Sequence, residues 1–125
     1  MILDTNALSA FFDGDPCLVQ LISEAQELFL PVIVLGEYRF GLRGSKLRKE
    51  WEPKLVEFSK LCSVLPILES TTVKYAAMRH DLKVAGTSIP ENDIWICALA
   101  AEYQLPVVTK DAHFDLVTQV KRISW

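Results

Sequence analysis

Residues 1–6 read Met1-Ile2-Leu3-Asp4-Thr5-Asn6. The first three are apolar and predict a short buried strand. The acid and the two polar residues that follow are typical of a helix start, where side-chain oxygens accept hydrogen bonds from free backbone N–H groups. A buried strand that leads directly into a helix is a unit of α/β folds, and here it places Asp4 at the carboxyl end of the strand.

The same alternation continues along the chain. Short apolar segments predict further strands at residues 27–30, 63–68, 105–108 and 120–123. Helical spacing of apolar residues predicts helices over residues 7–12, 18–25, 32–42, 45–62, 70–84 and 90–100, with a kink or a break at Pro53. Apolar strands that alternate with helices favour an α/β fold, in which helices flank a central, mainly parallel sheet of four to five short strands.

Length and composition narrow the class of protein. The 125 residues suit one domain, residues 1–125, and 50% of them are hydrophobic, which excludes a disordered chain. The net charge of −3 excludes a protein that is basic over its whole surface, so any nucleic acid must meet a local basic patch. Three cysteines without a CxxC pair favour a reducing cytoplasm, and we expect neither a signal peptide nor a membrane span.

Four acids stand where a parallel sheet gathers its ligand-binding residues. Asp4 and Asp111 each follow a predicted strand, while Glu37 and Asp93 lie on apolar helices beside such junctions. Carboxylates that are brought together in an apolar setting repel one another unless a cation compensates. Oxygen ligands without a His or Cys pattern favour Mg²⁺ or Mn²⁺ over zinc, and such an ion supports phosphoryl transfer by activated water.

Two of these acids also have a purely structural explanation. Asp93 at a helix start, and Asp4 before Thr5, would serve as caps or interact with the helix dipole. Glu37 is harder to explain in this way, because positions 33 and 41 hold no basic partner for an ion pair along the helix.

Four segments together resemble the ordered motifs of PIN-domain nucleases, and most closely those of VapC-type toxins. They are Ile2-Leu3-Asp4-Thr5-Asn6, Leu35-Gly36-Glu37-Tyr38-Arg39-Phe40-Gly41, Asn92-Asp93-Ile94-Trp95-Ile96-Cys97-Ala98-Leu99-Ala100 and Val108-Thr109-Lys110-Asp111-Ala112-His113-Phe114. The likeness spans essentially the whole chain and keeps the motif order of the family.

This resemblance implies a PIN-like fold and a Mg²⁺- or Mn²⁺-dependent endoribonuclease that leaves a 5′-phosphate. Its acidic pocket, which would serve both catalysis and metal binding, would consist of Asp4, Glu37, Asp93 and Asp111. Of these four positions, that of Asp111 varies most among members of the family. Thr5, Asn6, Asn92 and Thr109 are expected either to hold these carboxylates by hydrogen bonds or to act as caps. The resemblance further implies an RNA substrate, a VapB-type antitoxin that inhibits the toxin, and a homodimer.

Other residues are assigned by their surroundings. Five cations between residues 39 and 49 are expected either to hold an RNA backbone or to form a solvated helix end, and Lys110 is a second phosphate candidate. The aromatic residues Tyr38, Phe40, Trp51 and Phe58 are interpreted as core or interface anchors rather than as platforms on which bases stack, because they fall at helical spacing. His80 and His113 are isolated in sequence, so we expect no catalytic role for them, and Cys97 is expected in the core.

Three alternative functions stay open at this level. One is an RNA-processing PIN nuclease without an antitoxin, and another is a binding module that has lost catalysis. The third is a phosphoacceptor signalling domain, which would need an acid pair after its first strand and a lysine after its last. Here only one acid, Asp4, follows the first strand, which argues against that class.

Overall fold

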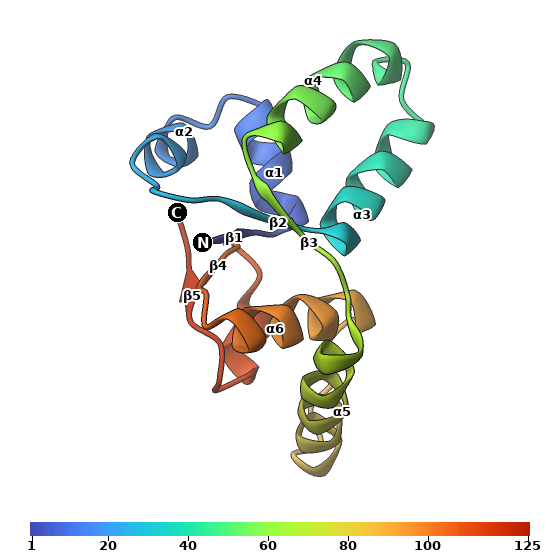
Figure 1. Cartoon of the computed structure of the whole chain (residues 1–125), viewed down its shortest axis with the longest axis vertical. Helices are drawn as coiled ribbons and strands as arrows, with labels where there is room; N and C mark the ends of the chain where they lie inside the picture. The colour runs from blue at the N-terminus through green and yellow to red at the C-terminus, as the bar shows by residue number, and fades with distance from the viewer.

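A parallel sheet of five short strands runs through the middle of the computed structural model, which describes all residues 1–125 (Figure 1). Its order is β3-β2-β1-β4-β5, and every neighbouring pair is parallel. The strands are β1 (Ile2–Leu3), β2 (Phe29–Pro31), β3 (Ser63–Leu65), β4 (Val107–Val108) and β5 (Arg122–Ile123). The predicted α/β fold with a parallel sheet is therefore confirmed.

Helices cover both faces of this sheet (Figure 1). On one face lie α1 (Thr5–Phe12), α2 (Pro16–Ser23), α3 (Val32–Arg43) and α4 (Arg48–Lys60). On the other lie α5 (Glu69–Val84), α6 (Glu91–Tyr103) and the 3₁₀ helix η1 (Ala112–Leu116). No helix is long and apolar enough to cross a bilayer.

The two central strands anchor the core. Ile2 and Leu3 of β1, and Val107 and Val108 of β4, have no exposed surface. Both faces of these strands are covered, so every position is apolar and the run reads as continuous rather than alternating. The predicted core position of Cys97 on α6 is confirmed, because that side chain is fully buried. The residues that follow β1 and β4 are thus attached to fully buried strands at the centre of the sheet.

Helix α4 differs from its prediction. It begins at Arg48, not at residue 45, and runs on past Pro53 without a break. Leu55 and Phe58 are buried as the spacing predicts, whereas Leu61 lies beyond the helix and is 78% exposed. Of the apolar residues at helical spacing, Leu55 and Phe58 therefore pack in the core and Leu61 does not.

An aromatic cluster joins α1, α3 and α4. The ring centroid of Phe12 lies 5.5 Å from the centroids of Tyr38 and Trp51 and 5.6 Å from that of Phe58. For Tyr38 and Phe58 the core interpretation holds, whereas Trp51 is half-buried and meets the core through the ring of Phe12. For Phe40 the core interpretation is wrong, because its side chain is 81% exposed, and the interface alternative stays a prediction. Residues two positions apart on a helix point in very different directions, so Tyr38 and Phe40 cannot both face the cluster.

Candidate active site

A hollow of about 910 Å³ opens at the carboxyl edge of the sheet and contains all four acids singled out in the sequence. Asp4 follows β1, Glu37 lies on α3, Asp93 lies in the first turn of α6, and Asp111 caps η1 after β4. Each of the four carboxylates thus comes from a different element, and all four line the same hollow. Apart from these acids, the lining combines polar or small residues with apolar ones: Thr5, Asn6, Ser9, Gly36 and Asn92, and Val32, Ile33, Phe40 and Pro90.

Asp4 is the most enclosed of the four, with 5% of its surface exposed. Its Oδ1 accepts a hydrogen bond from the backbone N–H of Thr5 at 2.6 Å, which caps α1. Its Oδ2 accepts two more, from Asn6 Nδ2 and from the Thr109 hydroxyl, each at 2.7 Å. Burial raises the pKa of the Asp4 carboxyl above its usual value, although these hydrogen bonds favour the charged form. The carboxylate is therefore held in one orientation.

Thr109 is the hub of this arrangement. Its fully buried hydroxyl donates to Asp4 and accepts hydrogen bonds from Asn6 Nδ2 at 2.9 Å and from the backbone N–H of Asp111 at 3.0 Å. Asn6 in turn accepts a hydrogen bond from the backbone N–H of Lys110 at 3.2 Å. The loop after β4 is thereby tied to the start of α1, and the two acids that follow the central strands are positioned together.

Glu37 is held from two sides. Its Oε2 accepts a hydrogen bond from the Thr5 hydroxyl, and its Oε1 accepts one from Asn92 Nδ2 at 2.7 Å. These bonds join α3 to α1 and to the start of α6. The expectation that Thr5, Asn6, Asn92 and Thr109 hold the carboxylates is confirmed, since each of them hydrogen-bonds to one of the acids.

Asp93 does not cap its helix. The cap residue of α6 is Pro90, and that end has no side-chain cap. Burial, and after it the negative charges of the other three carboxylates, raises the pKa of Asp93 to about 6. A carboxyl whose charged form is this costly, and which lies in a hollow beside other acids, is a candidate functional residue.

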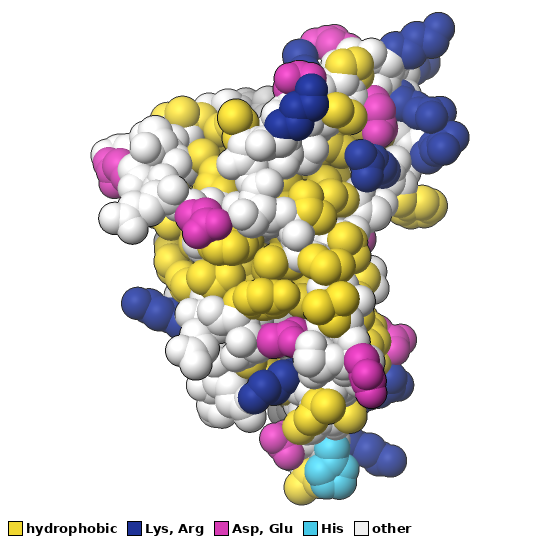
Figure 2. Space-filling view, in the orientation of Figure 1, with side chains coloured by type: hydrophobic (Ala, Val, Ile, Leu, Met, Phe, Trp, Pro, Cys, Tyr) yellow, Lys and Arg dark blue, Asp and Glu magenta, His cyan; other side chains and the backbone are white.

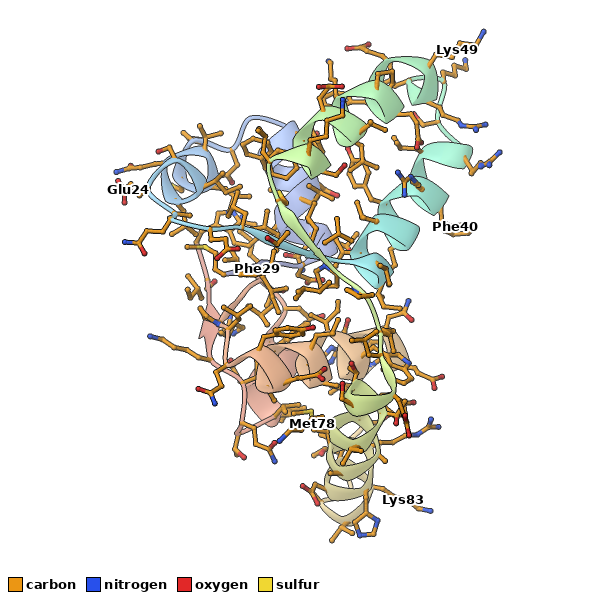
Figure 3. All side chains as sticks on the ribbon, in the orientation of Figure 1. Glu24, Phe29, Phe40, Lys49, Met78 and Lys83 are labelled. Atoms are coloured by element: carbon orange, nitrogen blue, oxygen red, sulfur yellow. The ribbon has the colours of Figure 1, made fainter.

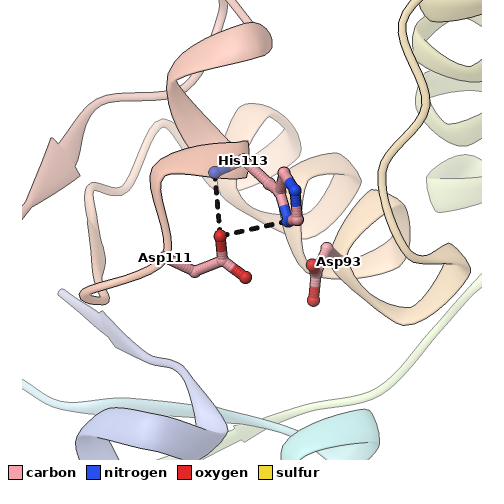
Figure 4. Close-up of side chains that lie close together, drawn as sticks. All are labelled: Asp93, Asp111 and His113. Carbon is pink, nitrogen blue, oxygen red and sulfur yellow. Dashed lines mark hydrogen bonds and ion pairs between the residues drawn. The ribbon is translucent and has the colours of Figure 1, made fainter.

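A histidine completes the group. Nδ1 of His113 lies 3.1 Å from Asp111 Oδ1, and the backbone N–H of His113 donates to the same oxygen at 2.8 Å (Figure 4). One ligand atom each from Asp93, Asp111 and His113 lies within 4.8 Å of the others. From the sequence, where His113 is isolated, we expected no catalytic role for it. One feature of the sequence indicates this contact: His113 lies two residues after Asp111, so its backbone N–H can donate to the Asp111 carboxylate.

Cations gather at the tip of the α3–α4 hairpin (Figure 2). A second hollow, of about 670 Å³, is lined there by Arg43, Ser45, Lys46, Arg48, Lys49, Glu52 and Pro53. Arg39 is ion-paired with Glu52 at 2.9 Å, which leaves the other four cations of the segment free of ion pairs. Lys110 lies over the ring of Trp125 and 3.7 Å from Asp15, and it does not line the acidic hollow. His80 lies exposed on α5, outside both hollows.

Two ribonucleases are similar in sequence to this chain. The chain is 28% identical to ribonuclease VapC5 of Mycobacterium tuberculosis over 115 residues, which are 90% of this chain and 84% of that protein. It is 25% identical to ribonuclease VapC2 of Rickettsia felis over 126 residues, or 98% and 90% of the two chains.

Solved structures share the fold. VapBC2 of Rickettsia felis, bound to a DNA fragment from its promoter, superposes with a TM-score of 0.88 at 23% identity, over 99% of this chain and 97% of that one. FitAcB of Neisseria gonorrhoeae gives a TM-score of 0.83 at 26% identity, over 98% and 95% of the two chains. The family model described as PIN domain matches residues 1–119, so the chain belongs to the PIN domain family.

Proposed function

We propose that this protein is a metal-dependent endoribonuclease and the toxin of a VapBC-type toxin–antitoxin pair. The observation that supports it best is the convergence of Asp4, Glu37, Asp93 and Asp111 on one hollow, in a PIN-family chain whose relatives are ribonucleases of the VapC type. A phosphoacceptor signalling domain, considered from the sequence, is set aside by the family match.

The four carboxylates suit a hard divalent cation. Their oxygen donors, with a single imidazole beside them, fit Mg²⁺ or Mn²⁺ better than zinc. We assign Asp4 and Asp93 as the main ligands and Glu37 as a ligand or a group that orients water, with Asp111 completing the set. When bound, the ion would supply a water nucleophile at neutral pH and neutralise charge on the phosphate.

The rest of the site would keep these carboxylates in place. Asp4 is fixed by three hydrogen bonds, and Glu37 is fixed by Thr5 and Asn92, so neither has to reorganise when substrate arrives. His113, by contacting Asp111, would hold that carboxylate toward Asp93. Without a cation, four negative groups would repel an RNA phosphate, so activity depends on the ion.

The RNA backbone would continue onto the second hollow. Arg43, Lys46, Arg48 and Lys49 lie on or beside the same hairpin that carries Glu37, and none of them is neutralised by an ion pair. Phosphate contacts of this kind are electrostatic and independent of base sequence. They would supply general affinity for RNA on a protein whose net charge is −3.

The partners follow from the relatives. Several of the similar solved structures are VapBC toxin–antitoxin complexes, including VapBC2 of Rickettsia felis and VapBC-5 of Mycobacterium tuberculosis. We accordingly assign to this chain a VapB-type antitoxin that inhibits it, a homodimeric assembly and a place in the cytoplasm.

The test is RNA cleavage by the purified protein. Wild-type protein should cut RNA with Mg²⁺ or Mn²⁺, stop with chelator, and resume when the ion is returned. Asp4→Asn and Asp93→Asn should each abolish cleavage while the circular dichroism spectrum stays that of the folded protein. Undiminished cleavage by both variants would refute the site, and no cleavage of any RNA by the wild type would refute the activity.

A further inference from the structure

Phe40 is the most exposed large hydrophobic side chain of the protein, at 81%. Every other phenylalanine is buried or half-buried. A single exposed apolar residue is common on protein surfaces and needs no explanation on its own. This one, however, forms part of the wall of the acidic hollow, together with Glu37 and Asp93.

The position of Phe40 on α3 is informative. It follows Glu37 by three residues, so it lies about one helical turn, or about 5 Å, farther along the axis. Arg43, the first cation of the basic hollow, follows Phe40 by another three residues. Along α3 the chain therefore presents a carboxylate, an aromatic ring and then positive charge. Figure 3 shows Phe40 projecting from α3, with Lys49 farther out at the tip of the hairpin.

This order matches the parts of a single RNA strand. The carboxylates, with their ion, would hold the phosphate that is cleaved, and the cations would hold phosphates farther along the backbone. Between them the strand offers a flat base, and aromatic side chains bind bases by stacking, with little preference among the four. We propose that Phe40 is the platform on which a base adjacent to the cleaved phosphate stacks. The inference rests on the ribonuclease function proposed above.

Charge and surroundings favour RNA over a protein at this spot. A protein anchor is usually set in a contiguous apolar patch. The wall around Phe40 includes the apolar residues Val32, Ile33 and Pro90, but acids, amides, hydroxyls and glycine outnumber them. Arg43, one turn farther along α3, carries a positive charge without an ion pair. A lone ring between negative and positive groups complements a strand in which bases and phosphates alternate.

The experiment measures RNA binding without cleavage. Protein carrying Asp93→Asn is titrated into a fluorescein-labelled 12-nucleotide oligoadenylate, and the Kd is read from anisotropy. Into this background are placed Phe40→Ala, Phe40→Leu and Phe40→Trp. Leu61→Ala serves as the matched control, because Leu61 is also strongly exposed but lies outside the hollow.

If a base stacks on the ring, Phe40→Ala and Phe40→Leu each raise the Kd about tenfold, and Phe40→Trp restores it. Leucine keeps an apolar side chain but has no flat face, so it separates stacking from simple apolar contact. The slope of log Kd against log salt stays the same, because no phosphate contact is lost. Leu61→Ala leaves the Kd unchanged.

Three results would overturn the proposal. An unchanged Kd in Phe40→Ala means that the ring does not touch RNA, and wild-type affinity in Phe40→Leu means that it does not stack. If Phe40→Ala loses the dimer in size-exclusion chromatography, or loses antitoxin binding, while its RNA affinity stays intact, then Phe40 contacts a protein partner instead of RNA. Failure of the ribonuclease function itself would appear differently, as absence of cleavage by the wild-type protein, and it would remove this inference as well.

Discussion

The hydroxyl of Thr109 donates a hydrogen bond to Oδ2 of Asp4 at 2.7 Å, across 105 residues of sequence. It joins the carboxyl ends of the two central strands, and it is fully buried. Groups that orient metal-binding carboxylates typically contribute 10- to 100-fold to metal affinity or activity. Removing this bond therefore tests the arrangement of the carboxylates more directly than removing a surface contact would.

Thr109→Val should lower RNA cleavage by about 10- to 100-fold while the protein remains folded. Valine fills the same space but can neither donate to Asp4 nor accept from the backbone N–H of Asp111, so the loss comes from misplaced carboxylates. The measurement is the initial cleavage rate as a function of Mn²⁺ concentration. Thr109→Ser keeps the hydroxyl and should retain most activity; equal loss in both variants would contradict the account.

Asp93 should make the metal-free protein less stable as pH rises. Its folded-state pKa is about 6, against an ordinary value of 3.8, so between these values the folded protein binds more protons than the unfolded chain. Its contribution to stability therefore falls as pH rises through this window and stays unfavourable above it. Asp93→Asn removes the charge and should raise the metal-free Tm at pH 7.5 by a few degrees.

Thermal unfolding in chelator, followed from pH 4.5 to pH 7.5, checks this expectation. The Tm difference between Asp93→Asn and wild type should grow with pH and level off above about pH 6. Mn²⁺ added at pH 7.5 should raise the Tm of the wild type far more than that of the variant, because binding to the folded state alone stabilises it. Parallel curves with and without the ion would show that Asp93 does not bind it.

The fold was predictable because its two central strands, β1 and β4, are short and apolar at every position. Ile2 and Leu3, like Val107 and Val108, have no exposed surface. These strands therefore appear in the sequence as continuous apolar runs, not as alternating apolar and polar residues. Strand ends were less predictable, since pairing decides them: the second strand begins at Phe29, which pairs with Ile2, rather than at residue 27. Local sequence carries no information about such a partner.

The candidate site was only partly predictable, for a similar reason. Asp4 and Asp111 were found by their place after strands, a property that a sequence displays. His113 enters the site because the backbone turns into η1 and Asp111 caps that turn. For Tyr38 and Phe40, helical geometry requires that they face different ways, but both are aromatic, and only packing against Phe12 selects Tyr38 for the interior.

The three cysteines should react very unequally with iodoacetamide. Cys17 is exposed, whereas burial raises the pKa of Cys62 to about 11 and that of Cys97 to about 12. Thiolates are the reactive form, so at pH 8 the folded protein should take up one adduct quickly. Mass spectrometry should count one adduct before unfolding and three after it. Cys17→Ser should show none in the folded state; rapid labelling of Cys97 there would contradict the packing of α6.

The basic hollow should govern the salt dependence of RNA binding. Each phosphate contact that is lost should reduce the slope of log K against log salt by about 0.7 for a single strand. Arg43→Gln and Lys46→Gln should therefore flatten the slope singly, and together by about twice as much, since neither residue has an ion pair to lose. The slope is measured by anisotropy in the Asp93→Asn background, from low to physiological salt.

Lys83→Gln is the matched control for these two variants. It removes one exposed positive charge from the far end of the molecule, on α5, opposite Lys49 at the tip of the hairpin (Figure 3). Since a charge this distant is largely screened at physiological salt, Lys83→Gln should leave the slope unchanged. If all three variants flatten it equally, the effect is one of net charge alone, and the hollow between α3 and α4 does not hold the RNA backbone.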